Sequence, residues 1–186
     1  MAVPENKKKY TVEEFFKLTE ESTERMELID GEIYNLAAPS RIHQMLVGNF
    51  HYVIKDYIRK NKGKCNVMIA PFDVVLWDNV VQPDVMVICD PSKLDDKRCN
   101  GAPDWIIEVT SSNYQNDYAD KLRLYQNTGV REYWIVDPER KMVTVLFFEK
   151  KPANFMLYQF SDTIPVNIYQ DAPVQLTINI EELLNL

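Results

Sequence analysis

Residues 82–88 read Gln82-Pro83-Asp84-Val85-Met86-Val87-Ile88, and residues 105–109 read Trp105-Ile106-Ile107-Glu108-Val109. Each run has the apolar, β-branched composition of a buried strand, yet each carries a carboxylate. Buried charges must be paired or bound to metal. Two acids held close together repel, and one is forced to protonate unless a divalent cation lies between them. The two runs therefore predict a functional site on buried strands.

Length and composition predict one folded domain spanning residues 1–186. The chain is 46% hydrophobic and 26% charged, which is ordinary for a globular protein, and 186 residues suffice for a single core. The N-terminus lacks the apolar stretch of a signal peptide, and no apolar run is long enough to span a bilayer. We therefore expect a cytoplasmic protein with no membrane partner.

The charge balance limits how the protein would hold nucleic acid. The net charge is 21 − 28 = −7, which argues against binding through a broad electropositive surface. Basic residues gather near the end of one predicted helix, and they are Lys55, Arg59, Lys60, Lys62 and Lys64. Cations favour helix C-termini and solvated surfaces, and this interpretation competes with a local nucleic-acid contact.

The cysteines indicate neither a disulfide framework nor a zinc site. Cys65, Cys89 and Cys99 are odd in number, and no CxxC or Cys/His spacing connects them. Disulfides are also rare in the cytoplasm. We interpret all three as reduced thiols.

Local signals near the N-terminus predict a helix, a hairpin and a longer helix. The first helix begins after Thr11, which can form a capping box. The dipeptide Asp30-Gly31 is typical of a two-residue hairpin turn. Ser40 is a suitable N-cap for the longer helix, and Gly63 ends it.

The remaining residues predict a mixed sheet with helices on its faces. The expected strands are 66–70, 72–77, 84–89, 105–110, 132–136, 141–148 and 155–160, with a turn at 78–79 and a polar loop over 90–101. A helix from Asn116 or Asp117 to Thr128 forms a βαβ unit with its neighbouring strands, and Asn179 caps a short last helix. The fold class is α/β, as an α+β mixed sheet in which adjacent strands carry the two acids.

Lys121 is a third charge that the pattern directs inward. Tyr118, Lys121, Leu122 and Tyr125 fall at i, i+3, i+4 and i+7 of a predicted helix, so the lysine lies on the apolar stripe that packs on the sheet. The sheet strand before this helix carries Glu108. A lysine near a metal-bound phosphate orients water or neutralises charge on phosphorus.

The order of motifs along the chain resembles a known group of enzymes. The motifs are Glu27-Leu28-Ile29-Asp30-Gly31-Glu32, His43, Gln82-Pro83-Asp84, Gly101-Ala102-Pro103-Asp104, Glu108-Val109-Thr110-Ser111, Lys121 and Gly129-Val130-Arg131-Glu132-Tyr133-Trp134-Ile135-Val136-Asp137-Pro138. In combination they resemble the PD-(D/E)XK nuclease superfamily and, within it, the Uma-two family of bacterial restriction-type endonucleases. The resemblance covers most of the chain. It implies a restriction-endonuclease-like core with an N-terminal helix and β-hairpin.

The resemblance also implies a metal site. In that superfamily an Asp, a Glu and a backbone carbonyl bind Mg²⁺, and a lysine assists the attacking water. Carried over, these ligands are Asp84, Glu108 and the Val109 carbonyl, with Mn²⁺ as a substitute ion. The superfamily's strand lysine falls at position 110, where this chain has Thr110. The resemblance implies that Lys121 has taken over its role.

The implied reaction is hydrolysis of a phosphodiester bond, with DNA as the expected substrate. Mg²⁺ would polarise the phosphate and lower the pKa of a bound water, which Lys121 would position or deprotonate. Glu27 would join the metal shell through water or support Lys121. His43 would contact phosphate or carry a proton, because its unperturbed pKa lies near neutrality.

Structural interpretations compete with each of these roles. Asp84 would merely begin a strand and accept backbone donors, and Glu108 would form a buried structural pair with Lys121. Glu27 would lie on the hairpin surface, and His43 would be a partly buried ring with ordinary hydrogen bonds.

Other polar residues near the motifs have structural explanations too. Asp104 follows a proline at a strand entrance, where a turn or cap role is favoured. Ser111, Ser112 and Asn113 would meet phosphate oxygens or simply form a loop. Tyr133 and Trp134 are expected in the core.

Two classes of function remain. The first is a metal-dependent endonuclease using Asp84, Glu108 and Lys121, and a homodimer would suit cleavage of both strands. The second is a catalytically inactive nuclease-fold module for binding or assembly, which the acidic net charge favours.

Overall fold

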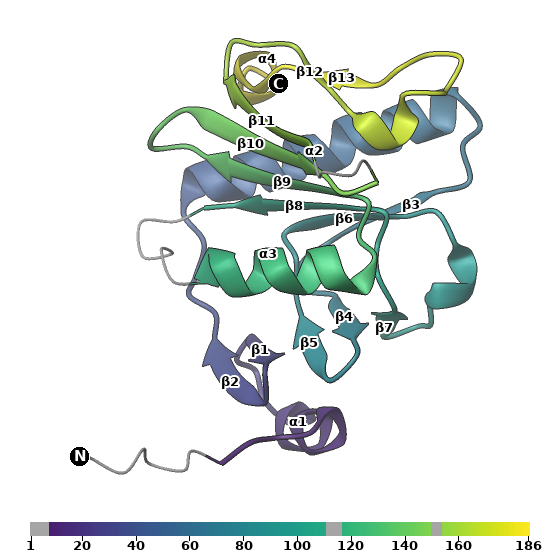
Figure 1. The fold of residues 1–186 in the computed structure, drawn as a ribbon. Helices are drawn as coiled ribbons and strands as arrows, with labels where there is room; N and C mark the ends of the chain where they lie inside the picture. The colour runs from purple at the N-terminus through teal and green to yellow at the C-terminus, as the bar shows by residue number, and fades with distance from the viewer. Residues whose placement is uncertain (1–7, 111–116, 150–153) are drawn as a thin grey trace.

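The protein is described by a computed structural model over residues 8–110, 117–149 and 154–186. The helices are α1 (Val12–Thr19), α2 (Arg41–Lys60), α3 (Asp117–Thr128) and α4 (Ile180–Leu184), with short 3₁₀ turns η1 (Pro91–Lys93) and η2 (Asn167–Tyr169). The strands are β1 (Met26–Ile29), β2 (Glu32–Asn35), β3 (Asn66–Ile69), β4 (Asp73–Leu76), β5 (Asn79–Val81), β6 (Val85–Ile88), β7 (Arg98–Asn100), β8 (Trp105–Val109), β9 (Glu132–Asp137), β10 (Met142–Phe147), β11 (Asn154–Gln159), β12 (Ile164–Pro165) and β13 (Thr177–Ile178). Figure 1 shows their arrangement.

A six-stranded mixed sheet forms the centre of the molecule. Its strand order is β11-β10-β9-β8-β6-β3. Strands β8 and β9 are parallel and joined by α3, so the predicted βαβ unit is confirmed. Asp84 directly precedes β6, Glu108 lies on β8, and these two strands pair with each other. The prediction that adjacent strands carry the acids is therefore confirmed.

The two faces of this sheet pack against different helices. Alternate residues on β6 and β8, such as Val85 and Ile107, join a core that contains Phe50 of α2. Their neighbours Met86 and Ile106 pack on the other side, in a second core that includes residues of α3. Figure 1 shows α2 and α3 on opposite faces of the sheet. This period-two alternation directs Glu108 toward α3, together with Ile106.

A second, five-stranded sheet lies below the first in Figure 1, and its order is β2-β1-β5-β4-β7. The predicted hairpin between β1 and β2 is confirmed, and Gly31 at its turn has a φ of +79°, which glycine adopts without strain. Phe15 of α1 packs on Leu28 and Val80 of this sheet. The sheet holds β1, and with it Glu27, near α3.

Strand β5 was not expected, and the predicted turn is wrong by one residue. The turn comprises Trp77 and Asp78, while Asn79 already belongs to β5. The side chain of Asn79 explains the shift, because its Nδ2 donates to Leu76 O (3.1 Å) and its Oδ1 accepts from Asp30 N (2.8 Å). Asparagine is typical of turns, but the Asn79 side chain here forms hydrogen bonds to β4 and to the residue that follows β1.

The expected polar loop over residues 90–101 also contains ordered structure. It includes η1 and strand β7, which pairs in parallel with β4. β7 is only three residues long, and just one of them, Cys99, is buried. A strand this short and polar leaves no alternation pattern in the sequence.

The interpretation of all three cysteines as reduced thiols is wrong for two of them. Cys65 and Cys89 form a disulfide, and Cys99 is free and buried. Cys65 precedes β3 and Cys89 follows β6, and the pairing of Asn66 with Ile88 brings their ends together. The disulfide therefore depends on the pairing register of β3 and β6, which the spacing of the cysteines in the sequence does not indicate. Burial raises the pKa of the Cys99 thiol to about 11.

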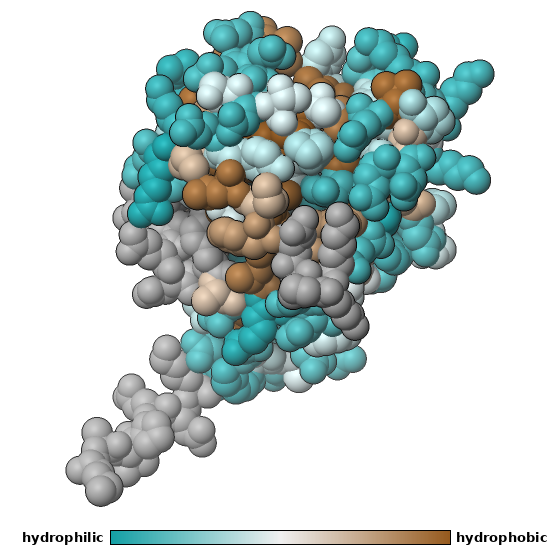
Figure 2. All heavy atoms as spheres, turned by 45° about the horizontal axis from the view of Figure 1, so that its top comes forward, coloured by the Kyte–Doolittle hydropathy of each residue, from teal (hydrophilic) through white to brown (hydrophobic). Residues whose placement is uncertain are grey.

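The outer surface combines a hydrophilic majority with smaller apolar areas. Figure 2 shows hydrophobic residues gathered on one part of an otherwise mostly hydrophilic face. The edge strand β11 exposes Phe155, Met156 and Leu157. Across the described ranges, the helices all fall short of the length and apolarity needed to cross a membrane.

Candidate active site

Asp84 is held at the mouth of the β6–β8 pair by two donors. Its Oδ2 accepts hydrogen bonds from the backbone N–H of Val109 (2.8 Å) and from His43 Nε2 (3.0 Å). The residue is 9% exposed. Among the described residues Oδ1 has no hydrogen-bond partner. Asp84 directly precedes β6 and accepts a backbone donor, as its structural interpretation expects, and in addition it contacts His43 and keeps one oxygen open.

Glu108 sits on β8 and is 3% exposed. Its Oε1 accepts from Lys121 Nζ (3.2 Å) and from the Tyr125 hydroxyl (2.8 Å), and both donors come from α3. Its Oε2 has no hydrogen-bond partner within the described part of the chain. Like Asp84, Glu108 therefore uses one oxygen for its protein contacts and keeps the other open.

Lys121 points inward, as the helical spacing predicted, and is 1% exposed. Besides Glu108, it contacts Glu27 of β1, with Nζ 3.0 Å from Oε1 and 2.9 Å from Oε2. Glu27 is fully buried and also accepts from the backbone N–H of Gln82 (2.8 Å). The interpretation of Glu27 as a surface residue is wrong. Two functional roles were predicted for it, binding the metal through water and supporting Lys121, and its contacts match the second.

His43 lies in the first turn of α2, where Ser40 caps the helix and accepts from the His43 N–H. This placement aims its ring at Asp84. The other ring nitrogen, Nδ1, is buried without a hydrogen-bond partner in the described structure. Among the described residues, one ring nitrogen of His43 therefore has a hydrogen-bond partner, Asp84, and the other has none.

The electrostatics of the cluster centre on Glu108. Its pKa is raised from 4.5 to about 7, mainly by burial, and the negative charges of Asp84 and Glu27 contribute to the rise. Lys121 and the hydrogen bond from Tyr125 oppose that rise. Burial also raises the pKa of Tyr125 well above its usual range, so its hydroxyl stays a donor. A cation next to Glu108 would relieve this accumulation of negative charge.

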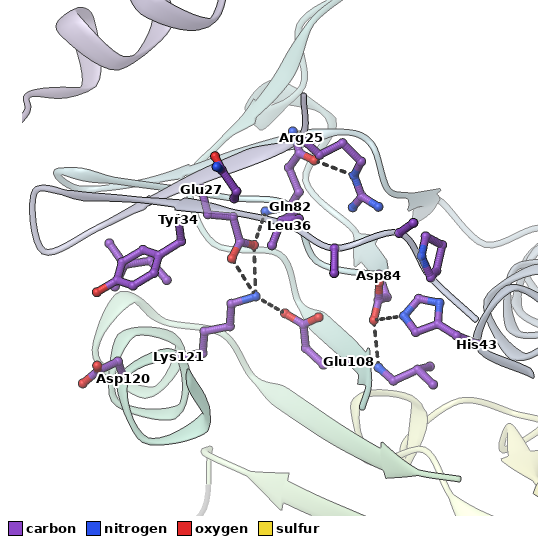
Figure 3. Close-up of a pocket in the computed structure, with 16 residues that line it drawn as sticks. Arg25, Glu27, Tyr34, Leu36, His43, Gln82, Asp84, Glu108, Asp120 and Lys121 are labelled. Carbon is purple, nitrogen blue, oxygen red and sulfur yellow. Dashed lines mark hydrogen bonds and ion pairs between the residues drawn. The ribbon is translucent and has the colours of Figure 1, made fainter. Parts of the chain in front are cut away.

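These residues surround one cavity of about 410 Å³. Its lining residues are Arg25, Glu27, Ile29, Tyr34, Asn35, Leu36, Ala37, Ala38, Pro39, His43, Gln82, Asp84, Glu108, Val109, Asp120 and Lys121. Figure 3 shows Lys121 between Glu27 and Glu108, with Asp84 and His43 at the other end. The segment between β2 and α2 covers the cavity with mainly apolar residues. All six site residues predicted from the sequence, Val109 included, line it.

The donor set fits a hard divalent cation. Asp84 Oδ1 and Glu108 Oε2 are open carboxylate oxygens on the same cavity. The N–H of Val109 faces Asp84, and since N–H and C=O of one strand residue point to the same edge, its carbonyl faces the same way. Within the described ranges no three His, Cys, Asp or Glu side chains form a complete metal site. Two carboxylates, a carbonyl and waters suit Mg²⁺, which keeps several waters.

Sequence patterns missed part of this arrangement. Tyr125 was placed on the apolar stripe of α3, but its bond to Glu108 was not foreseen, although it lies one helical turn after Lys121. Arg25, which lines the cavity, was not considered. The sequence signal was its spacing, because Arg25 and Glu27 are two residues apart and share one face of a strand.

Asp104 has structural contacts, but they are not those of the turn or cap role expected from the sequence. Its Oδ2 accepts from the backbone N–H of Cys89 (2.7 Å), and its Oδ1 lies 3.1 Å from Arg131.

The basic cluster at the end of α2 lies at the opposite end of that helix from His43. Tyr133 and Trp134 are buried in the core, as expected. The loop residues 111–113 and the side chain of Tyr118 lie outside the described residues.

Comparisons with known proteins give relatives over most of the chain. The model of the Uma2 family, described as "Putative restriction endonuclease", matches residues 12–178. Two proteins of Synechocystis sp. are similar, both described as uncharacterized. One, slr1290, is 24% identical over 161 residues and covers 84% of each chain. The other, sll1609, is 30% identical over 145 residues, which are 74% of this chain and 80% of that protein.

A solved structure has a similar fold. It is the crystal structure of a protein from Anabaena variabilis described as "a putative nuclease belonging to DUF820". The match has a TM-score of 0.76 and 21% sequence identity, and it covers 94% of this chain and 97% of the other. The mixed-sheet, restriction-endonuclease-like fold predicted from the sequence is thereby confirmed.

Proposed function

The chain belongs to the Uma2 family, and from that premise we propose that it is a divalent-metal-dependent endonuclease that hydrolyses phosphodiester bonds in DNA. The observation that carries the proposal is the buried pair of Asp84 and Glu108, each with one open oxygen on the cavity beside Lys121. The Anabaena protein of similar fold is itself described as a nuclease, which supports the same activity.

Asp84, Glu108 and the Val109 carbonyl would hold Mg²⁺, with Mn²⁺ as a substitute. When bound, the ion would polarise the scissile phosphate and lower the pKa of a nearby water. His43 and the Val109 N–H fix Asp84, and Tyr125 fixes Glu108, so the ligands are oriented before the ion arrives.

Lys121 would position the reacting groups. An ammonium that contacts both Glu27 and Glu108 is a hydrogen-bond donor, so we assign it to orienting water and neutralising charge on phosphorus rather than to taking a proton. In the reaction the oxygen of water bonds to phosphorus and the ester P–O bond breaks. The proton of water passes to solvent, and the leaving oxygen takes up a proton from solvent to become a hydroxyl group. Glu27, fixed by the Gln82 N–H, would hold Lys121 in place.

The test is cleavage of supercoiled plasmid, single-stranded DNA and RNA with Mg²⁺ or Mn²⁺. We expect DNA cleavage by the wild type, none without a divalent ion, and a loss of about a hundredfold or more in Asp84→Asn. The matched control is Asp162→Asn, which removes a carboxylate from a surface turn, where it accepts from Gln159 N. This control should cut at the wild-type rate.

Other outcomes have defined meanings. An ion-binding protein that cuts none of these substrates would contradict the proposal and favour the inactive nuclease-fold module. Cleavage of RNA alone would keep the chemistry and overturn the substrate. If both strands of DNA are cut together, a homodimer is expected, because a two-fold axis places two sites on antiparallel strands. Sedimentation equilibrium of the wild type with and without DNA measures this.

A further inference from the structure

Arg25 is a cation of the candidate site to which no role has been assigned. It directly precedes β1, two residues before Glu27. Side chains alternate along an extended chain, so Arg25 and Glu27 point to the same side, and both line the cavity. Arg25 is half-buried. Figure 3 shows its guanidinium on the side of the cavity where Asp84 and His43 lie.

One nitrogen of the guanidinium is anchored. Nε donates to Gln82 Oε1 (3.1 Å), and Gln82 is itself held through Nε2, which donates to Asp73 Oδ1 (2.9 Å). The two terminal nitrogens of Arg25 have no hydrogen-bond or ion-pair partner in the described part of the chain. Their donors are therefore oriented by Gln82 but unused.

This arrangement differs from that of Arg131, another half-buried arginine. Arg131 pairs with Asp104 and Glu149, each at 3.1 Å or less. Arg25 lies in a cavity lined by carboxylates, and no ion pair joins it to them among the described residues. A guanidinium presents a planar fork that matches two oxygens of a carboxylate or phosphate.

The charges of the cavity indicate which anion the Arg25 guanidinium would bind. Lys121, the other cation in the lining, is already in contact with Glu27 and Glu108. A phosphodiester entering the cavity would meet open acid oxygens, which repel it, unless positive charge faces it. Arg25 is the described lining residue with free charged donors to do so.

We propose that Arg25 is the phosphate-binding residue of the cavity, and that its terminal nitrogens hold non-bridging oxygens of a substrate phosphodiester while Gln82 fixes the orientation. This inference rests on the proposed nuclease function and adds a substrate-binding residue to it. Arg25 touches substrate and takes no part in bond making, so its loss weakens substrate binding more than the chemical step.

The experiment measures binding of a short fluorescein-labelled DNA duplex by anisotropy, with Ca²⁺ in place of Mg²⁺ and the probe checked for cutting afterwards. Arg25→Met should weaken binding by about tenfold to a hundredfold, the loss expected for a charge-assisted pair. The slope of log affinity against log salt should fall by about 0.9, which marks the loss of one phosphate contact. A purely structural arginine would not change this slope.

Two further variants sharpen the result. Arg25→Lys keeps the charge but loses the fork, so it should keep the salt slope and bind a few-fold more weakly than wild type. Lys97→Met removes one positive charge from an exposed residue directly before β7, outside the cavity lining, and should leave affinity and slope unchanged. In cleavage assays, Arg25→Met should raise KM by more than it lowers kcat.

The failures of the two proposals can be told apart. If the wild type neither binds nor cuts DNA, the nuclease function falls and the role of Arg25 with it. If the wild type cuts DNA but Arg25→Met keeps its KM and salt slope, only the role of Arg25 is overturned. An equal loss of affinity in Lys97→Met would also overturn it, because net charge alone would then explain the effect.

Discussion

Glu132 and Glu108 are both buried carboxylates, yet their surroundings differ. Glu132 accepts from Trp134 Nε1 (2.7 Å) and Asn167 Nδ2 (2.9 Å) at one oxygen and from the Ile168 N–H (2.8 Å) at the other. Glu108 has donors at one oxygen only, and its other oxygen is open on the cavity side. Burial raises the pKa of both. Burial is therefore common to both acids, and the open oxygen on a cavity is what distinguishes Glu108.

Lys121 is an ionic partner that Glu108 has and Glu132 lacks, and its replacement should have the largest effect on the free energy of unfolding. Lys121→Met leaves Glu27 and Glu108 buried without a counter-charge, so the free energy of unfolding should fall by about 3–5 kcal/mol in urea titrations at neutral to alkaline pH. The control is Lys60→Met, which removes an exposed pair with Asp56 and should cost less than about 1 kcal/mol. Equal losses would show that the interior cluster does not depend on charge pairing.

Glu132→Gln tests the structural side of the comparison. The amide would set an N–H₂ group against the Ile168 N–H or the other donors, and the lost hydrogen bonds should cost about 1–3 kcal/mol of unfolding free energy. Mg²⁺ affinity, measured by calorimetric titration, should stay at the wild-type value. A marked drop in that affinity would mean that Glu132 is coupled to the candidate metal site.

The pH dependence follows from the raised pKa of Glu108. Its folded-state pKa of about 7 lies above the ordinary 4.5, so the folded protein holds an extra proton between these values. The stability that this carboxyl contributes is therefore present below about pH 4.5 and is lost as the pH rises toward 7.

Ion binding should show the opposite trend. Because the ion competes with that proton, Mg²⁺ affinity should rise by up to tenfold per pH unit until about pH 7 and then level off. Calorimetric titrations across this range measure the slope, with Glu108→Gln as the control that should not show it. A pH-independent affinity in the wild type would contradict the assignment of Glu108 as a ligand.

Tyr125→Phe should have the smallest effect. It removes one hydrogen bond from Glu108, at about 1 kcal/mol of unfolding free energy. This bond also lowers the pKa of Glu108, so without it the pKa should rise further and Mg²⁺ affinity near neutral pH should fall a few-fold. Tyr133→Phe, a change of the neighbouring buried tyrosine, is the matched control for affinity. Equal affinities in the two variants would remove Tyr125 from the site.

Local signals accounted for the parts of the fold that depend on neighbouring residues. The Thr11 capping box, the Asp30-Gly31 turn and the Ser40 cap are each completed within a few residues, and all were confirmed. Strand β7 and the Cys65–Cys89 disulfide depend on pairing between distant segments. The sequence shows neither, because register is set by the whole sheet.

In the candidate site, too, the features set by neighbouring residues were predicted and those set by distant residues were not. Charges inside apolar runs marked Asp84 and Glu108, and helical period marked Lys121, so each was found from its own neighbours. The role of Gln82 in holding both Glu27 and Arg25 was not found, because it connects residues more than fifty positions apart. Glu132 could not be separated from Glu108 either, since the difference lies in their hydrogen-bond donors.

The most direct test is a Mg²⁺ titration of unfolding stability in wild type, Asp84→Asn and Glu132→Gln. An ion that binds only the folded protein should raise the unfolding free energy by about 2.7 kcal/mol at a hundred times its Kd. We predict that gain in the wild type and in Glu132→Gln, and its loss in Asp84→Asn. The same gain in all three proteins, or none in the wild type, would contradict a metal site built on the open carboxylates.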